Sequence, residues 1–238
     1  MKRLVKVLCL SAVLIGMSNA AQAQFRQSIF LNGNIPTGDF FSNAKPASGN
    51  VPLMDKEIGK DATLGFGFGY RASYRFDVGV GMVAPFANID FLWNTISSEW
   101  SEKYSDARYN TPTYFNIPAM GGVSYFYDEL PWSDITAYGE FGVGTDLFWI
   151  TPEGGTNITT QKNEEYAYKA TFAVAWMLGL GAYFGQHVSA GLYYYGLGTH
   201  NIDYTEGTLK EHPEIVIANL DRSRRSVGSV ALRIGFHF

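Results

Sequence analysis

The sequence is poor in three features: cysteine, long apolar runs and basic charge. Its single cysteine, Cys9, lies near the N-terminus, so the rest of the chain has no thiol for a disulfide bond, a metal site or nucleophilic catalysis. No run after residue 23 reaches the roughly 20 apolar residues that a membrane-spanning helix needs. The formal net charge is −4, which gives no reason to expect nucleic-acid binding.

The N-terminus has the three parts of a secretory signal peptide. Lys2, Arg3 and Lys6 are basic, Val7–Met17 is an apolar run too short to span a bilayer, and Ala21–Ala23 supplies an A-x-A cleavage site. We therefore expect residues 1–23 to be a cleaved signal peptide and residues 24–238 to form one domain. Three basic residues leave with the signal peptide, so the formal net charge of −4 falls by three, to −7.

The last thirteen residues, Ser226–Phe238, alternate between apolar or glycine positions and mixed positions. A period of two places one apolar and one mixed face on a strand. A terminal strand that ends on an aromatic residue resembles the closing strand of bacterial outer-membrane barrels. The resemblance implies that Phe236 and Phe238 are a recognition signal for the barrel-assembly machinery.

Seven further segments alternate in the same way, and their connections differ regularly in length. We expect eight strands, at about residues 25–34, 62–74, 78–94, 113–126, 135–150, 170–184, 188–197 and 226–238. The connections after the second, fourth and sixth strands are short, at residues 75–77, 127–134 and 185–187. The others are long, at residues 35–61, 95–112, 151–169 and 198–225. Short periplasmic turns that alternate with long extracellular loops are typical of membrane barrels.

These features predict an all-β protein, an eight-stranded antiparallel up-and-down transmembrane β-barrel. The even strand number places both termini in the periplasm. Aromatic residues make up 16% of the sequence and glycine occurs 26 times, which suits lipid-facing rings and a crowded interior. A soluble β-sandwich is the alternative, but it would not put Phe66, Phe172 and Trp176 on exposed faces.

The opposite parity of each strand is expected to fill the lumen, which in eight strands is wide enough only for side chains. Arg233 belongs to that set, because an arginine at mid-depth facing lipid costs about 2–4 kcal/mol. It then needs an acidic partner, for which we expect Glu140 first and Asp146 or Asp90 next. The resulting charge network is interpreted as structural, with a gate or a proton or solute path as the alternative.

The histidines do not match a catalytic or metal motif. His187 and His237 are expected at the periplasmic end, and His200 and His212 on the last long loop, as part of a solvated polar surface. No nucleophile elbow or H-E-x-x-H pattern surrounds them. We therefore expect no catalytic, cofactor or metal residues. Ile215–Ile217 on the same loop either extends a strand beyond the membrane or forms a contact patch.

Two motifs carry a family resemblance that spans residues 24–238. Tyr114–Pro118 is similar to an aromatic-x-x-Ile-Pro element, and Tyr138–Gly144 resembles the fifth strand, of the outer-membrane β-barrel-domain proteins abundant in Bacteroidetes. The chain also resembles the small barrels of OmpX, OmpW and OmpA type. The resemblance implies a cell outer membrane location, with membrane lipid, the assembly machinery and an unidentified extracellular ligand as partners. It implies a structural or surface-interaction role; a narrow, porin-like channel for small or hydrophobic solutes is the alternative, and an enzyme that modifies lipid A is third.

Overall fold

Eight long strands make up most of the part of the chain that the computed structural model describes, namely residues 25–41, 62–96, 108–110, 112–127, 135–156, 163–209, 212–216 and 223–238. The strands are β1 Phe25–Thr37, β2 Ala62–Tyr74, β4 Met82–Ile96, β6 Thr113–Tyr127, β7 Ile135–Ile150, β10 Thr171–Phe184, β11 Val188–Ile202 and β14 Ser223–His237. The expected signal peptide lies outside the described residues.

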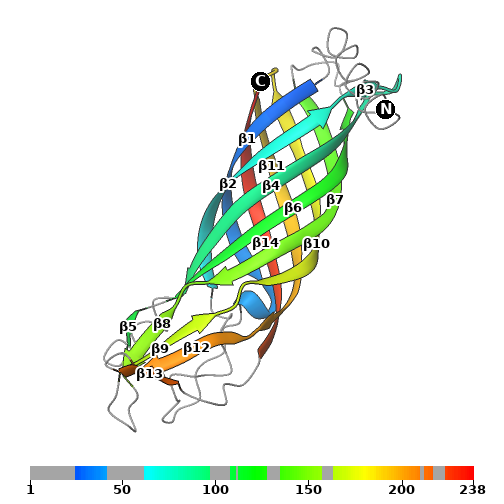
Figure 1. The fold of residues 1–238 in the computed structure, drawn as a ribbon. Coiled ribbons are helices and arrows are strands. Elements are labelled where there is room, and N and C mark those ends of the chain that lie inside the picture. Colours follow the sequence, from blue (N-terminus) through cyan, green and yellow to red (C-terminus); the bar gives the residue numbers. More distant parts are fainter. Residues whose placement is uncertain are drawn as a thin grey trace, which may run out of the picture.

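The eight strands form a closed antiparallel barrel (Figure 1). Neighbours in the sheet follow the order β2, β1, β14, β11, β10, β7, β6 and β4, and pairing of β2 with β4 closes the ring. The first and last strands of the chain pair with each other, from Ser28 opposite His237 to Thr37 opposite Gly228. The predicted fold class, an eight-stranded up-and-down barrel, is confirmed.

The strand ends differ from the sequence prediction mainly at two places. β2 and β7 have the predicted bounds, whereas β4 begins four residues late because the short β3, Phe76–Asp77, folds back onto its start. β11 continues five residues past the predicted end, with a register shift at Gly196 and Gly198. Gly198 has a φ of +90°, which an L side chain rarely adopts, and this lets the ladder resume beyond the irregularity.

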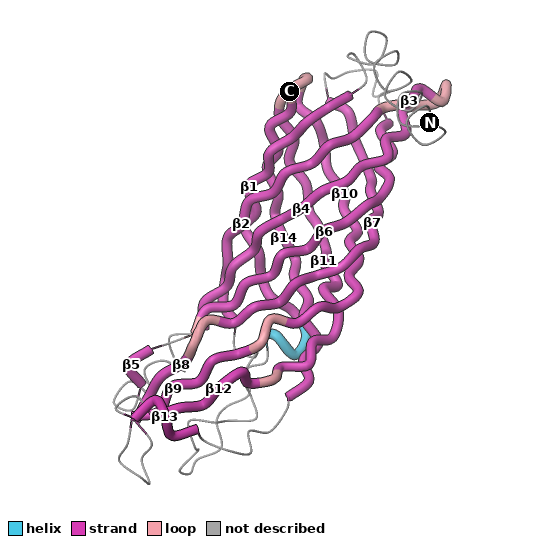
Figure 2. Tube along the Cα trace, in the orientation of Figure 1, coloured by secondary structure: helices cyan, strands magenta, loops and turns pink. Residues whose placement is uncertain are grey.

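The long connections are not entirely loops. Five short strands form a second sheet at the end of the barrel away from the C-terminus (Figures 1 and 2). They are β5 Arg108–Asn110, β8 Glu153–Thr156, β9 Asn163–Tyr168, β12 Tyr204–Leu209 and β13 His212–Val216, in the order β13, β12, β9, β8, β5. Ile215 and Val216 thus lie in a strand beyond the barrel, which agrees with the extension interpretation; Ile217 lies outside the described residues.

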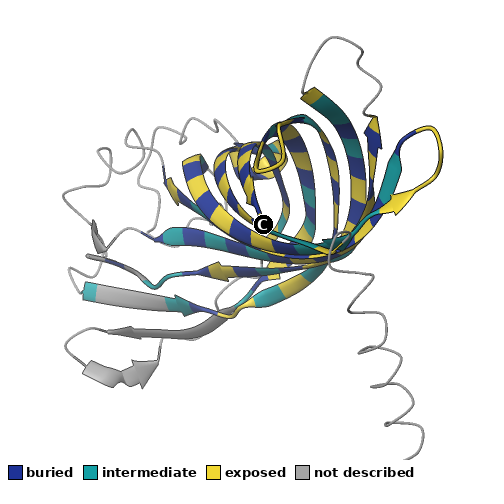
Figure 3. Cartoon of the chain, turned by 90° about the horizontal axis from the view of Figure 1, so that it is seen from above, coloured by how far each residue is buried: buried dark blue, intermediate teal, exposed yellow. Residues whose placement is uncertain are grey.

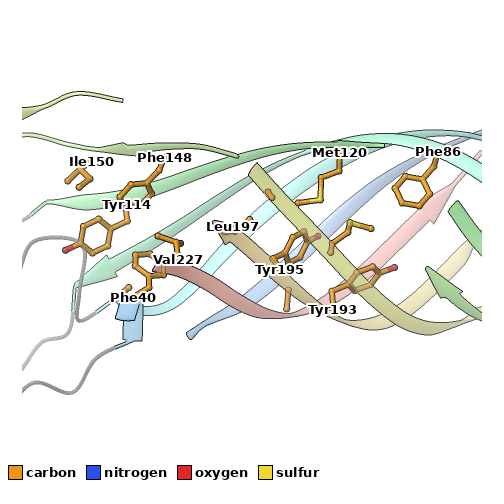
Figure 4. Packing of buried hydrophobic residues seen from close by; sticks show 14 of the residues in the cluster. Phe40, Phe86, Tyr114, Met120, Phe148, Ile150, Tyr193, Tyr195, Leu197 and Val227 are labelled. Carbon is orange, nitrogen blue, oxygen red and sulfur yellow. The ribbon is translucent and has the colours of Figure 1, made fainter. Parts of the chain in front are cut away.

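Side chains alternate between the lumen and the outer surface along every barrel strand, as the banding in Figure 3 shows. The interior is filled over its length by large side chains from all parts of the chain, including Phe86 and Met120 near one end and Phe148 and Ile150 near the other (Figure 4). A lumen filled by side chains is the expected outcome for eight strands.

A short 3₁₀ turn, η1 Gly38–Phe41, covers the barrel end that carries the second sheet (Figure 2). Its Phe40 is fully buried and its ring meets those of Tyr114 and Phe148 edge-on, with centroids 5.4 and 5.9 Å apart. The chain that follows β1 therefore turns back and closes the lumen with an apolar side chain. Among the described residues, no helix has the length and hydropathy needed to cross a bilayer.

Candidate functional site: the charged lumen

The centre of the lumen contains an ion pair between β14 and β4. Arg233 Nη2 donates to both carboxylate oxygens of Asp90 at 2.7 Å, and Arg233 Nε donates to Asn32 Oδ1 at 3.0 Å. The hydroxyl of Tyr195 contacts the guanidinium and donates to Asp90 at 3.1 Å, while Asn88 Nδ2 donates to the same carboxylate at 2.7 Å. Arg233 and Asp90 are fully buried, so the pair is shielded from solvent.

A second ion pair joins β2 to β7. Arg71 donates through Nη1 and Nη2 to the two oxygens of Glu140 at 2.6 and 2.5 Å, which is the bidentate geometry of strong guanidinium–carboxylate pairs. Ser124 Oγ donates to the same carboxylate at 3.0 Å. Both side chains are buried.

Phe30 lies between the two pairs. The Arg71 guanidinium carbon is 5.1 Å from the Phe30 ring centroid and the Arg233 carbon is 4.4 Å from it. Arg71 also stacks on Phe86 at 4.0 Å and Arg233 on Tyr193 at 4.4 Å. The two positive charges are thus each neutralised by one carboxylate and held on aromatic faces, where a cation is attracted to the ring.

Glycines make the space for these carboxylates. A Cβ on Gly69 of β2 would lie 1.9 Å from Asp90 Oδ1, and a Cβ on Gly179 of β10 would lie 2.4 Å from the Tyr193 ring and 3.0 Å from Glu140 Cγ. The glycine positions that alternate with apolar residues in the sequence therefore admit the charged side chains of neighbouring strands.

The pairing differs from the one expected from the sequence. Arg233 binds Asp90, the later choice, whereas Glu140, the first choice, binds Arg71. Arg71 was missed although it continues the lumen parity of Gly65, Gly67 and Gly69, and that parity would have found it. The partner choice was wrong because contacts across a barrel depend on how the strands are offset, which alternation within one strand does not reveal.

Asp146 lies apart from both pairs and contacts His200. The carboxylate Oδ2 is 3.2 Å from His200 Nε2, and both side chains are fully buried. His200 Nδ1 is hydrogen-bonded to Thr171 Oγ1 at 3.0 Å, and its ring centroid is 5.1 Å from that of Phe148. The expectation that His200 belongs to a solvated loop is wrong, because the extension of β11 turns its side chain into the lumen. His212 lies in β13, and its side chain is outside what the structure describes.

His237 fastens the end of β14 to the strands on both sides. Its Nδ1 is 2.6 Å from Ser28 Oγ of β1 and its Nε2 is 2.8 Å from Ser189 Oγ of β11. His187 lies in the turn between β10 and β11, where its Nδ1 is 3.1 Å from the carbonyl oxygen of His237. Both histidines lie at the short-turn end, and their contacts join strands at the seam where the barrel closes.

The ion pairs and the apolar cluster together fill the lumen and give each central guanidinium group a carboxylate partner. The charged groups at the centre bind one another, and the apolar cluster encloses them from both sides. Within the described residues, no group of three or more His, Cys, Asp or Glu is placed to hold a metal ion.

No protein-family model and no curated protein matches the chain. Among solved structures, it is similar to Ail, the attachment invasion locus protein of Yersinia pestis, with 11% identity and a TM-score of 0.42 over 90% of this chain and 98% of that one. It is also similar to the outer membrane protein OprG from Pseudomonas aeruginosa, with 10% identity and a TM-score of 0.42 over 90% and 94%. Neisserial surface protein A has 11% identity and a TM-score of 0.38 over 90% and 95%. These likenesses are distant, and the barrel architecture rests on the strand pairing of this chain itself.

Proposed function

We propose that this chain is an integral outer-membrane β-barrel with a structural or surface-interaction role, and that its filled lumen does not conduct. The membrane location is supported by the apolar character of the outer surface of the barrel. All eight strands expose large apolar side chains there, with exposed fractions such as 64% for Phe66, 74% for Phe172 and 79% for Val174. Soluble monomers rarely expose apolar patches beyond a few hundred Å².

The distribution of charge supports the same placement. Within the described residues of the eight strands, Arg224 is the one charged side chain in the exposed class, and it lies near the end of β14 that carries the second sheet. The other charged residues of these strands are buried or half-buried. A barrel whose outside is apolar and whose inside is charged reverses the pattern of a soluble protein and suits a hydrocarbon surrounding.

The interaction part of the proposal rests on the second sheet. It projects beyond the barrel end opposite the termini, which is the extracellular end if both termini are periplasmic (Figure 1). Within the described residues, β5 and β13 each have a neighbour on one side only, so their outer edges present backbone groups suited to pairing with another chain.

The membrane assignment is tested by cell fractionation and gel mobility. We expect the protein in the outer-membrane fraction, and we expect its mobility in detergent gels to change on boiling, because a closed barrel resists the detergent until it is heated. A soluble protein with unchanged mobility would refute the proposal.

One observation favours the alternative of a conduit that opens sideways. The pairing of β4 with β6 passes from Ile89–Ala119 to Leu92–Asn116, and Pro118, which has no backbone N–H to donate, lies in the gap. A gap in the ladder weakens one seam of the barrel wall. Liposome swelling separates the two functions: the packed lumen predicts no uptake of small sugars or amino acids, and solute-dependent swelling would favour the conduit.

The third possibility is an enzyme acting on lipid A, and we propose that the chain is not one. Thr171 is hydrogen-bonded to His200, and His200 Nε2 lies 3.2 Å from Asp146, but the histidine and the carboxylate are fully buried beneath the Phe148 ring. A general base has to reach the proton that it removes. We expect the lipid A mass spectrum of a deletion strain to be unchanged, and a shifted lipid A mass that plasmid-borne protein restores would contradict this.

A further inference from the structure

A cavity of about 310 Å³ opens at the short-turn end of the barrel, on the opposite side of the ion pairs from the Phe40 closure. Its polar lining comes from β1, from Arg75 and β3 after β2, and from β7 and β10 with the turn that follows. The residues that matter here are Arg26, Arg75, Asp77, Thr136, Tyr183 and Gln186. None of them takes part in the ion pairs at the centre of the lumen.

Arg75 is fixed in place but incompletely bonded. Its guanidinium carbon is 4.4 Å from the ring centroid of Phe126 and 4.9 Å from that of Tyr183, so the group is held between two aromatic side chains. Its Nε is buried and has no hydrogen-bond acceptor in the described part of the chain. Buried donors are nearly always satisfied, and one left unsatisfied on a charged group costs more than one on a neutral group. The geometry therefore leaves this donor available to an acceptor beyond the described residues.

The charge of the lining favours an anion. Arg26 lies opposite Ser73 in the β1–β2 register, two residues from Arg75, and it forms no ion pair with any described residue. Asp77 is the one carboxylate among the lining residues, and its Oδ1 already accepts the backbone N–H of Gly79 at 2.7 Å. The cavity is thus lined by two positively charged guanidinium groups and by one carboxylate, which already accepts a hydrogen bond.

We propose that this cavity is a binding site for a phosphate group, carried by a phospholipid headgroup or by a soluble phosphate ester. Guanidinium groups match phosphate oxygens in a bidentate manner, and the Thr136 hydroxyl of β7 and the Gln186 amide of the turn after β10 offer further donors. A tetrahedral group uses donors that converge from several directions better than a planar carboxylate does. The cavity is large enough for the phosphate together with part of the molecule that carries it. The lipid source rests on the proposed membrane placement, whereas the soluble source does not.

The experiment uses the full chain folded in a non-ionic detergent. Calorimetric titration with sn-glycerol 3-phosphate tests the soluble source, and native mass spectrometry with phosphatidylglycerol against phosphate-free diacylglycerol tests the lipid source. We expect Arg75→Gln and Arg26→Gln each to weaken phosphate binding by about tenfold or more, since each removes charge-assisted hydrogen bonds. Arg224→Gln is the matched control, because it removes one arginine at the opposite end of the barrel and leaves the cavity intact.

Phosphate-dependent binding in either arm, lost in the two cavity variants and kept in the control, supports the site and identifies its source. Phosphate binding in neither arm, or equal losses in Arg224→Gln, would overturn it. Arg75→Lys keeps the charge but removes the Nε donor, so binding at the wild-type level in that variant would also contradict the role given to Nε. Because gel mobility tests the barrel independently, a correctly folded membrane protein without phosphate binding refutes this site alone.

Discussion

Arg233 is the residue on which the centre of the barrel depends most. It binds Asp90, Asn32 and Tyr195 at once, and it is fully buried. A buried ion pair gives little net stability when compared with well-packed apolar residues, but the loss of one partner leaves an uncompensated charge. Mutation of Arg233 is therefore expected to destabilise the barrel mainly because the Asp90 carboxylate stays buried without a cation, and less because an attraction is lost.

We predict that Arg233→Ala lowers the free energy of unfolding by about 3–5 kcal/mol, because Asp90 is left buried without a cation. Urea unfolding of the protein in lipid vesicles, followed by tryptophan fluorescence, measures this. Arg224→Ala is the control, since Arg224 is exposed and its loss is expected to have little effect. We also expect planar-bilayer conductance to remain at background, and a large, lasting conductance in Arg233→Ala would favour the gate interpretation.

A pair of glycines in neighbouring strands gives a second test at the residue scale. A Cβ on Gly69 would lie 1.9 Å from Asp90 Oδ1, whereas a Cβ on Gly33 of β1 would meet no heavy atom within 4 Å. We predict that Gly69→Ala destabilises the barrel by about 1–3 kcal/mol through overpacking, and that Gly33→Ala does not. The same vesicle unfolding assay compares them. Equal effects of the two substitutions would show that Asp90 moves aside without cost.

At the scale of the element, β14 is the strand that closes the ring. It pairs with β1 on one side and β11 on the other, and His237 holds both neighbours through Ser28 and Ser189. The side chains of the two terminal aromatic residues point the other way: Phe236 and Phe238 are exposed on the outer surface, at 47% and 58%. Their position leaves them accessible to another protein before the strand is in place.

We predict that removing Phe238 together with Phe236→Ala slows assembly in cells while the assembled barrel keeps its gel mobility. The reason is that the two exposed rings add little to the packing of the lumen. A pulse-chase experiment that follows the heat-modifiable fraction with time measures the rate. Leu232→Ala removes an exposed side chain from the same strand, and an equal delay in that control would argue against a specific assembly signal.

At the scale of the whole molecule, the barrel and the second sheet separate two tasks. The barrel buries its charges and closes its lumen, whereas the second sheet lies beyond the end of the barrel, outside the band of exposed apolar side chains (Figure 1). No strand belongs to both sheets in the described part of the chain. The hydrogen-bonded ladder that closes the barrel therefore does not include the second sheet.

We predict that replacing residues 153–168 and 203–222 by short turns leaves the barrel folded and heat-modifiable but abolishes binding of the intact cells to whichever surface partner they recognise. Gel mobility checks the first part, and adhesion of expressing cells to immobilised proteins and polysaccharides checks the second. Adhesion that stays unchanged after trimming would contradict the proposed role of the second sheet.

Much of the barrel followed from local pattern. Alternation predicted all eight strands, with the bounds of β2 and β7 as observed, and it placed Arg233, Asp90, Glu140 and Asp146 in the lumen. It failed where the structure depends on distant parts of the chain. The second sheet was missed because its strands are short and polar, and they form a ladder only where the barrel brings three long connections to the same end.

The sequence by itself determined which face of each strand is the apolar outer face and which meets the lumen, because a period of two is a local property of extended backbone. Only the tertiary structure decided that Arg233 binds Asp90, that Arg71 binds Glu140, and that His200 is enclosed beside Asp146. Closing a sheet into a barrel offsets each strand against the next, and this offset sets which lumen side chains lie at the same depth. That offset is a property of the closed ring and belongs to no single strand.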